Sequence, residues 1–404
     1  MALFWVACEA RTGQIITDLP LLDVKRVSSV LGTYTTTIAS MPVVEAPEGW
    51  ERVVEGEATY LILLDDARSL STPAILWGGR VVVTERSLSD VVTMSLASFE
   101  SALDRAYVGD YTYTQVGQCS IIADLVERFF IAGGNWPLRV QVNNFGVQRD
   151  RAYTDASDKT VLSAISELSA VEGGPEFTVS WEWNLADPNV PKIRPVLTVG
   201  DRIGAPAPAG LGPAATFDAP GCVVDAVERR DYSGGHYAND VMASSSGVGD
   251  ARPQSPRQTF TDPLRPRLQY RFTPSTSITE VSTLTAHAQS ALAQMRTGGR
   301  TLSLKADLAA APQLGGDWAL GDDIGYAIGG IGAAPDQTII PDAYTDTYAD
   351  EYGHAVSAPK YPNGRDTVPA FPGGIRGVAR CIGWELDLAE PPTVTPILEL
   401  GGAQ

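Results

Sequence analysis

The sequence has few of the residues that proteins use for metal centres or nucleophilic sites. Its 404 residues include four cysteines and three histidines, with neither a CxxC nor an HExxH motif: Cys8, Cys119, Cys222, Cys381, His236, His287 and His354. The cysteines lie more than 100 residues apart, which argues against a zinc site or a disulfide framework. We therefore expect buried, apolar cysteines in a chain made in a reducing compartment. His287 falls within a predicted helix, where a packed or solvent-facing role is expected.

Long apolar runs and positive charge are also scarce. No stretch approaches the ~18 apolar residues of a membrane span, so no membrane insertion is expected. The apolar run near the N-terminus, within residues 1–8, is short and follows no Lys or Arg, which favours a first β-strand over a signal peptide. Thirty basic against 48 acidic residues give a net charge of −18. Such a surface repels phosphate backbones, which argues against ordinary nucleic-acid binding.

Motifs of catalysis and cofactor binding are absent as well. No G-x-S-x-G, P-loop or G-x-G-x-x-G follows a predicted strand, so we predict no cofactor and no enzymatic activity. The acidic segment 321–326 is interpreted as a tight turn between strands. A glycoside hydrolase needs two carboxylates roughly 5–9 Å apart. The only acid–aromatic groupings are Asp65-Asp66 and Glu182 beside Trp181 and Trp183, and for the tryptophans a structural role is favoured.

Strand and turn patterns dominate what remains. Residues 177–184 alternate apolar and polar and predict a half-buried strand with both tryptophans on one face. The runs 74–77 and 80–85 flank Gly78-Gly79, which predicts a hairpin with its turn at the glycines. Helices are predicted at 119–131, at 158–171 with Asp155 or Ser157 as cap, and at 277–295 with Ser277 or Thr279 as cap. Residues 94–107 fit either a helix or a strand followed by a short helix.

These patterns predict a mainly β, α+β chain with two small β-barrel-like domains and an intervening α/β domain. Residues 1–100 form the first β-domain, completed by about 216–245. The α/β domain spans 101–202, and the Pro/Gly/Ala-rich segment 203–215 is a linker. A helix and the second β-domain occupy 246–404, with an inserted loop at 330–370. No internal repeat is visible, although the two β-domains could be distant duplicates.

Three groups of residues are candidates for specific contacts. Segment 342–353 combines carboxylates that could bind calcium (Asp342, Asp346, Asp350, Glu351) with tyrosines suited to a protein interface (Tyr344, Tyr348, Tyr352). The carboxylate spacing of four departs from an EF-hand, and a plain inserted loop is the alternative. Arg257, Arg265 and Arg267 belong to a basic cluster that either meets an acidic neighbouring copy or is solvated. Trp181 and Trp183 are the third group.

Four stretches carry a resemblance to a known family. They are residues 76–82, residues 120–126, the helix at 159–174, and 320–324 together with 377–386. In this order they resemble the tail-hub family of tailed bacteriophages, which includes baseplate hubs and the N-terminal hub region of tail-associated proteins. Within that family it resembles in particular the minor tail proteins of phages that infect actinobacteria. The 342–353 loop and the 203–215 linker have no counterpart in that pattern.

The resemblance implies a structural role at the tail tip of a virion, for a protein made in the host cytoplasm. It implies two related barrels per subunit and a homotrimer whose ring joins the tail tube to the tip or fibre proteins. Distal tail protein, tape measure protein and tip or fibre proteins would be its partners, with DNA only in transit. The residues alone leave two alternatives open: a virion-associated hydrolase of cell-wall glycan or peptidoglycan, and a carbohydrate-binding adhesin.

Overall fold

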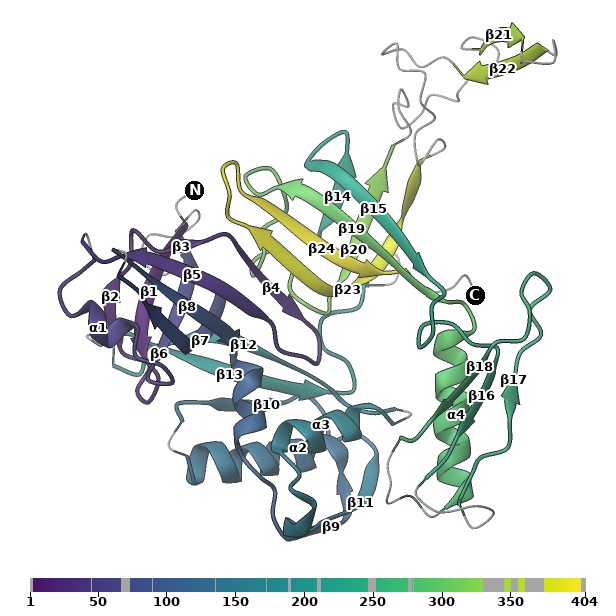
Figure 1. Ribbon diagram of the computed structural model, residues 1–404, viewed down its shortest axis with the longest axis horizontal. Helices are drawn as coiled ribbons and strands as arrows, with labels where there is room; N and C mark the ends of the chain where they lie inside the picture. The colour runs from purple at the N-terminus through teal and green to yellow at the C-terminus, as the bar shows by residue number, and fades with distance from the viewer. Residues whose placement is uncertain are drawn as a thin grey trace.

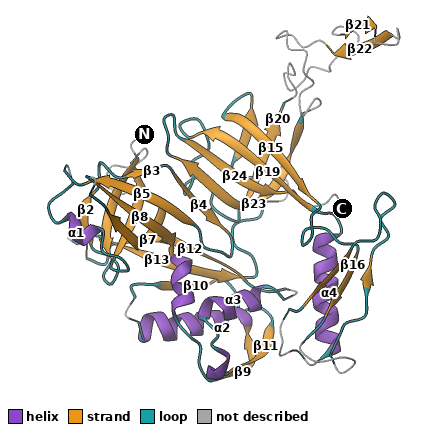
Figure 2. Cartoon of the chain, viewed as in Figure 1, coloured by secondary structure: helices purple, strands orange, loops and turns teal. Residues whose placement is uncertain are grey.

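The computed structural model describes residues 3–44, 46–66, 73–88, 90–134, 136–171, 173–187, 190–208, 212–245, 252–274, 278, 280–329, 345–349, 355–359 and 374–400. Over these residues the chain is mainly β, with two large sheets, an α/β unit and a smaller unit built on one helix (Figure 2). The predicted α+β, mainly β fold class is confirmed. None of the helices in the described ranges combines the length and apolarity needed to cross a bilayer.

The first sheet, here called module 1, is formed by residues 3–98. Its strands lie in the order β2-β1-β6-β7-β8-β5-β3. They are β1 (Leu3–Glu9), β2 (Ile15–Asp18), β3 (Asp23–Val24), β5 (Thr36–Pro42), β6 (Thr59–Asp65), β7 (Ala74–Arg86) and β8 (Val91–Ser98), with the short helix α1 (Trp50–Val53) before β6. The strands at the two ends of this path, β2 and β3, follow each other in the chain. Within the described sheet β2 and β3 do not pair with each other.

Strand β6 lies between two hydrophobic cores. Every residue of its sequence TYLILLD is buried. Leu61 and Leu63 face the core shared with the second sheet, whereas Tyr60 and Ile62 face the core of the α/β unit. A strand covered on both faces needs a continuous apolar run rather than an alternating one, which this sequence supplies.

The α/β unit follows module 1. A 3-10 turn (Phe99–Arg105) leads into β9 (Tyr111–Gly117), α2 (Gln118–Val126), β10 (Arg139–Val142), β11 (Gln148–Tyr153), α3 (Val161–Ser169), β12 (Glu176–Asn184) and β13 (Lys192–Gly200). Of the two interpretations of 94–107, the strand followed by a short helix is the one observed. The cap predicted for α3 is wrong, because the Thr160 hydroxyl accepts the Ser163 N–H and the helix starts there.

The second sheet, module 2, takes strands from both ends of the chain. It runs β14-β20-β23-β24-β19-β15, and β4 pairs with β23 beside this path. These strands are β4 (Arg26–Val30), β14 (Thr216–Ala219), β15 (Val223–Asp231), β19 (Gly299–Asp307), β20 (Asp323–Ile328), β23 (Ile375–Asp387) and β24 (Thr393–Glu399). Residues 216–245 were expected to complete the first β-domain. Instead β14 and β15 pair with β20 and β19 of module 2, because the apolar faces of these strands join that core.

The turn before β20 holds the predicted linker in place. Gly321, with φ 91°, turns the chain into this strand. The carboxylates of Asp322 and Asp323 accept the N–H groups of Ala205 and Ala207 at 2.6 and 2.9 Å. The described part of segment 203–215 is thereby bonded to module 2.

A fourth part, here called the α4 unit, is inserted between β15 and β19. It consists of β16 (Asp240–Ala243), β17 (Gln258–Thr259), β18 (Gln269–Phe272) and α4 (Val281–Met295), and its core is separate from the others. The helix begins after Glu280, later than predicted, and Ser277 and Thr279 lie outside the described residues. Within the predicted insertion at 330–370, β21 (Thr345–Ala349) and β22 (Ala355–Pro359) form a hairpin (Figure 1).

The hairpin predicted at Gly78-Gly79 is wrong. Strand β7 runs unbroken through both glycines, and its turn to β8 lies beyond Arg86. A Cβ atom at Gly78 would lie 2.4 Å from the Trp181 ring and 2.6 Å from Ile62. The glycine is there because the tryptophan ring of β12 crosses the backbone of β7.

Candidate assembly surfaces

Trp181 and Trp183 pack within their own chain. Trp181 contacts Tyr60 and Phe99 edge-on, with ring centroids 5.0 and 6.3 Å away. The Trp183 indole N–H donates a 2.8 Å hydrogen bond to the carbonyl of Pro73. Both rings therefore join β12 to module 1, and their role at an interface stays a prediction.

Glu182, on the opposite face of β12 from these tryptophans, is held by two arginines. Its carboxylate accepts hydrogen bonds of 2.8 and 2.7 Å from Arg139 and Arg194. Partial burial alone would raise the pKa of Glu182, but the bonds and charges of the two arginines outweigh it and lower the pKa. A general acid needs a raised pKa, so this carboxylate is poorly suited to that role.

The arginines of the predicted basic cluster form ion pairs with carboxylates of the α4 unit. Arg257 and Arg267 both pair with Asp240, whose side chain is 2% exposed. Arg265 pairs with Asp262 at 2.9 Å and lies over the Tyr232 ring, 4.3 Å from its centroid. These contacts fold segment 252–267 onto the α4 unit, so it is not merely a solvated loop.

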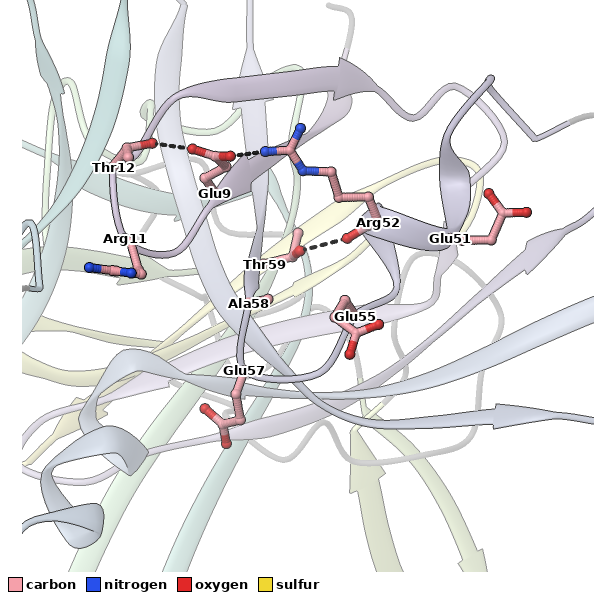
Figure 3. Close-up of a pocket in the computed structure, with 9 residues that line it drawn as sticks. All are labelled: Glu9, Arg11, Thr12, Glu51, Arg52, Glu55, Glu57, Ala58 and Thr59. Atoms are coloured by element: carbon pink, nitrogen blue, oxygen red, sulfur yellow. Dashed lines mark hydrogen bonds and ion pairs between the residues drawn. The ribbon is translucent and has the colours of Figure 1, made fainter.

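An open hollow of about 870 Å³ lies between the β1–β2 turn and α1 (Figure 3). It is lined by Glu9, Arg11, Thr12, Glu51, Arg52, Glu55, Glu57, Ala58 and Thr59. Figure 3 shows Glu9 held between Thr12 and Arg52, while Glu51 and Glu55 extend away from the other residues drawn. The hollow is acidic, and its paired Glu9 does not form a carboxylate dyad. It is better suited to receive a basic surface than to perform chemistry.

Two arginines occupy matching positions in the two modules. Arg80 of β7, only 3% exposed, donates to Glu57 at 2.5 Å and to the Ser101 hydroxyl at 2.9 Å. Arg380 of β23 binds Glu176 through both terminal nitrogens of its guanidinium group and donates to the Ile203 carbonyl at 2.8 Å. Each arginine thus connects its module to the start or the end of the α/β unit.

Several predicted site residues cannot be placed. Asp342, Tyr344, Asp350, Glu351 and Tyr352 lie outside the described residues, and for Asp346 and Tyr348 only the backbone of β21 is described. The calcium and tyrosine-interface hypotheses therefore stay predictions. Across the described ranges, no group of three or more Cys, His, Asp or Glu side chains is arranged to hold a metal ion.

The described cysteines and His287 behave as the sequence predicted. All four cysteines are free and buried. His287 is buried in α4, and burial together with the charges of Arg151 and Arg149 lowers its pKa.

Sequence reasoning missed the exposed apolar residues on the strands. Ile38, Val83 and Val227 lie on β5, β7 and β15 with more than 45% of their surface exposed. Alternation along each strand was a usable signal, because it places these residues opposite the buried face. They mark strands where module surfaces remain available for contact.

Comparison with known proteins finds a similar fold in two solved structures of tail proteins. No family model and no curated protein sequence matches the chain. Among solved structures it is similar to the tail protein from Neisseria meningitidis MC58, with 12% identity, a TM-score of 0.55, and coverage of 100% of this chain and 98% of that one. It is also similar to the 43 kDa tail protein of prophage MuSo2 from Shewanella oneidensis, with 11% identity, a TM-score of 0.53, and 98% of each chain covered. The whole chain thus shares its fold with tail proteins.

Proposed function

We propose that this chain is a structural tail-tip hub protein of a tailed bacteriophage. Three copies would form a ring that joins the tail tube to the tip or fibre proteins and surrounds the DNA channel. The observation that carries the proposal is the fold, which matches two tail proteins over nearly the full length of all three chains. The phage type we propose is one that infects actinobacteria, as the sequence resemblance implies.

The two-module architecture supports a ring of this symmetry. Modules 1 and 2 have the same strand order over most of their length and share one continuous core. Three copies of a chain with two similar modules present six similar units around one axis, so a threefold particle can fit a sixfold tube. Distal tail protein and tape measure protein on one side, and tip or fibre proteins on the other, are the proposed partners.

The charge of the chain supports the passage of DNA without binding. A net charge of −18 disfavours stable phosphate contacts on most of the surface. We propose an acidic or uncharged channel lining, and a basic lining in the assembled ring would contradict it.

The proposal is tested on phage particles and on purified protein. Antibody labelling should locate the chain at the tail tip, and its mass in solution should approach three times 43.0 kDa. A protein that is absent from particles, or a persistent monomer that cleaves cell-wall glycan, would contradict the proposal. Binding to cells by an isolated monomer would instead favour the adhesin.

A further inference from the structure

The α4 unit is the basic part of an acidic chain. Residues 232–298, which lie between β15 and β19, carry six basic and four acidic residues, whereas all other residues together carry 24 and 44. Four of the six basic residues are exposed: Arg257, Arg267, Arg271 and Arg296. The unit therefore presents positive charge to solvent, while the remainder of the chain is strongly acidic in sum.

The loop after β17 holds three apolar side chains in solvent. Leu264 is 85% exposed, and Phe260 and Leu268 are each more than 40% exposed. The N–H groups of Phe260 and Leu268 donate to the backbone carbonyl and the side-chain oxygen of Asn239 at 2.9 and 2.8 Å. The Leu264 N–H donates to the Asp262 carboxylate at 2.8 Å. Because these bonds already order the loop, it loses little entropy when it binds a partner.

Arg296 adds a positive charge to this apolar surface. Its guanidinium group lies 5.9 Å from the centre of the Phe260 ring. It is exposed and forms no ion pair with another residue that the structure describes. Aromatic and arginine side chains are enriched where proteins contact each other, and exposed apolar side chains gathered in one place mark such surfaces. We call this surface the α4 tip, and it consists of Phe260, Leu264, Leu268 and Arg296.

One side of module 1 carries the opposite charge. Residues 43–57 hold five glutamates and one arginine, Arg52, which pairs with Glu9 outside this segment. Glu48 and Glu51 are exposed, and neither forms an ion pair with another residue in the described ranges. Their carboxylates are therefore available to a basic partner.

Exposed apolar side chains lie beside these carboxylates. Val44 is 77% exposed, and Leu88, in the turn between β7 and β8, is fully exposed. The Asp90 carbonyl accepts the N–H of the residue before Val44 at 2.7 Å. Arg86 lies over the Trp50 ring of α1, 4.9 Å from its centroid. These contacts bring the two segments together, and we call the surface that they form the module 1 corner, consisting of Val44, Glu48, Glu51 and Leu88.

The α4 tip and the module 1 corner lie in different parts of the molecule. In Figure 1, α1, which carries Glu51, and the α4 unit are drawn on opposite sides of the chain. The two surfaces therefore do not face each other within one copy. Complementary surfaces at separate places on one chain make head-to-tail contacts between copies, and such contacts form a ring when the rotation closes.

We propose that the α4 tip of one copy docks on the module 1 corner of the next copy. The apolar residues of the tip would cover Val44 and Leu88, and Arg296 would face Glu48 and Glu51. An apolar centre with charged groups at its rim is typical of a specific protein contact. The inference rests on the proposed ring, and it assigns the surfaces through which the copies meet.

Charges placed at the two apolar centres test the docking. Leu264→Lys should weaken self-association about tenfold by removing an apolar contact, and Leu264→Asp about a hundredfold, because its carboxylate also faces the acidic corner. At Leu88 the order should reverse, with Leu88→Lys the weaker variant, because this residue faces the basic tip. The double variant Leu264→Asp/Leu88→Lys restores opposite charges and should associate more tightly than Leu264→Asp alone.

Matched controls separate the docking from a general effect of charge. Phe145→Asp and Phe145→Lys make the same changes in the α/β unit, at a side chain that is 77% exposed and lies outside both surfaces. Both should assemble like the wild type, and circular dichroism should show every variant folded. Sedimentation velocity over a concentration series measures assembly in solution, and the amount of the chain in purified particles measures it in the virion.

The outcomes distinguish the docking from the ring. If Lys and Asp have equal effects at Leu264 and at Leu88, in solution or in the particle content of a wild type that is monomeric alone, the docking is wrong while the ring stands. Variants that form normal rings but do not enter particles would indicate that another tail protein covers the α4 tip, which also overturns the docking. A wild type that remains monomeric and is absent from particles overturns both.

Discussion

Replacing Gly78 by alanine tests the crossing of Trp181 over β7. The added methyl group would lie 2.4 and 2.6 Å from Cε2 and Nε1 of Trp181 and 2.6 Å from Ile62, all well inside van der Waals contact. Overpacking of this kind costs about 1–3 kcal/mol. The lower entropy of the unfolded alanine chain returns about 0.4–1 kcal/mol, because Gly78 has no positive φ. We expect a net loss of about 1–2 kcal/mol.

Equilibrium urea unfolding followed by circular dichroism measures this loss. Gly234→Ala is the control, because no atom lies within 4 Å of its added methyl group and its φ is not positive. That variant should be unchanged or slightly more stable. In the double variant Gly78→Ala/Trp181→Phe the smaller ring should relieve the clash, giving a coupling energy of about 1 kcal/mol. A Gly78→Ala protein as stable as the wild type, with no coupling energy to Trp181→Phe, would refute the crossing of Trp181 over β7.

Three further predictions concern Asp240, Trp183 and the four cysteines. Asp240→Asn should destabilise the α4 unit by about 1–3 kcal/mol, measured by hydrogen exchange in α4. Burial alone would raise the pKa of Asp240, but its arginine partners lower the pKa overall. The stabilisation by the ionised carboxylate is therefore present at neutral pH and is lost as the pH falls through the lowered pKa of the folded state. The Asp240→Asn variant should not show this loss of stability in acid. Trp183→Phe should cost about 1 kcal/mol by removing the bond to Pro73, and equal urea midpoints would contradict it. The four buried cysteines should resist Ellman's reagent until the chain unfolds, since burial raises the pKa of Cys8 and Cys381 to about 12; fast labelling of native protein would count against this.

Local patterns predicted elements well where one contact surface decides the residue pattern. The strand at 177–184 is observed as β12, with Trp181 and Trp183 on one face, because alternation follows directly from one buried side. The same logic failed at Gly78-Gly79. Glycine pairs signal both tight turns and close approaches, and only the position of Trp181, about 100 residues away, distinguishes them.

The module to which each strand belongs is decided by pairing between strands that lie far apart in the sequence. Strands β14 and β15 belong to module 2, and nothing in their local sequence indicates whether they pair with residues before or after them. The repeat between the modules was also hidden. The two modules share most of their strand order, but the segments between their strands differ, with the α4 unit inserted between β15 and β19.

The basic cluster shows why charge patterns alone do not identify a site. The clustered arginines are candidates for an interface in the sequence, yet Asp240 and Asp262 already neutralise three of them within the chain.

Arg80 and Arg380 connect the two similar modules to the same α/β unit. Both sit just before the bulge of their long strand, and both direct a guanidinium group towards the α/β unit. Arg80 reaches Ser101 at the start of that unit and lies 5.9 Å from the Trp136 ring centroid. Arg380 binds Glu176, where β12 begins. The bidentate pair of Arg380 with Glu176 fixes the orientation of the two groups as well as their distance. In the ring that we propose, the α/β unit would therefore act as a brace between the two modules.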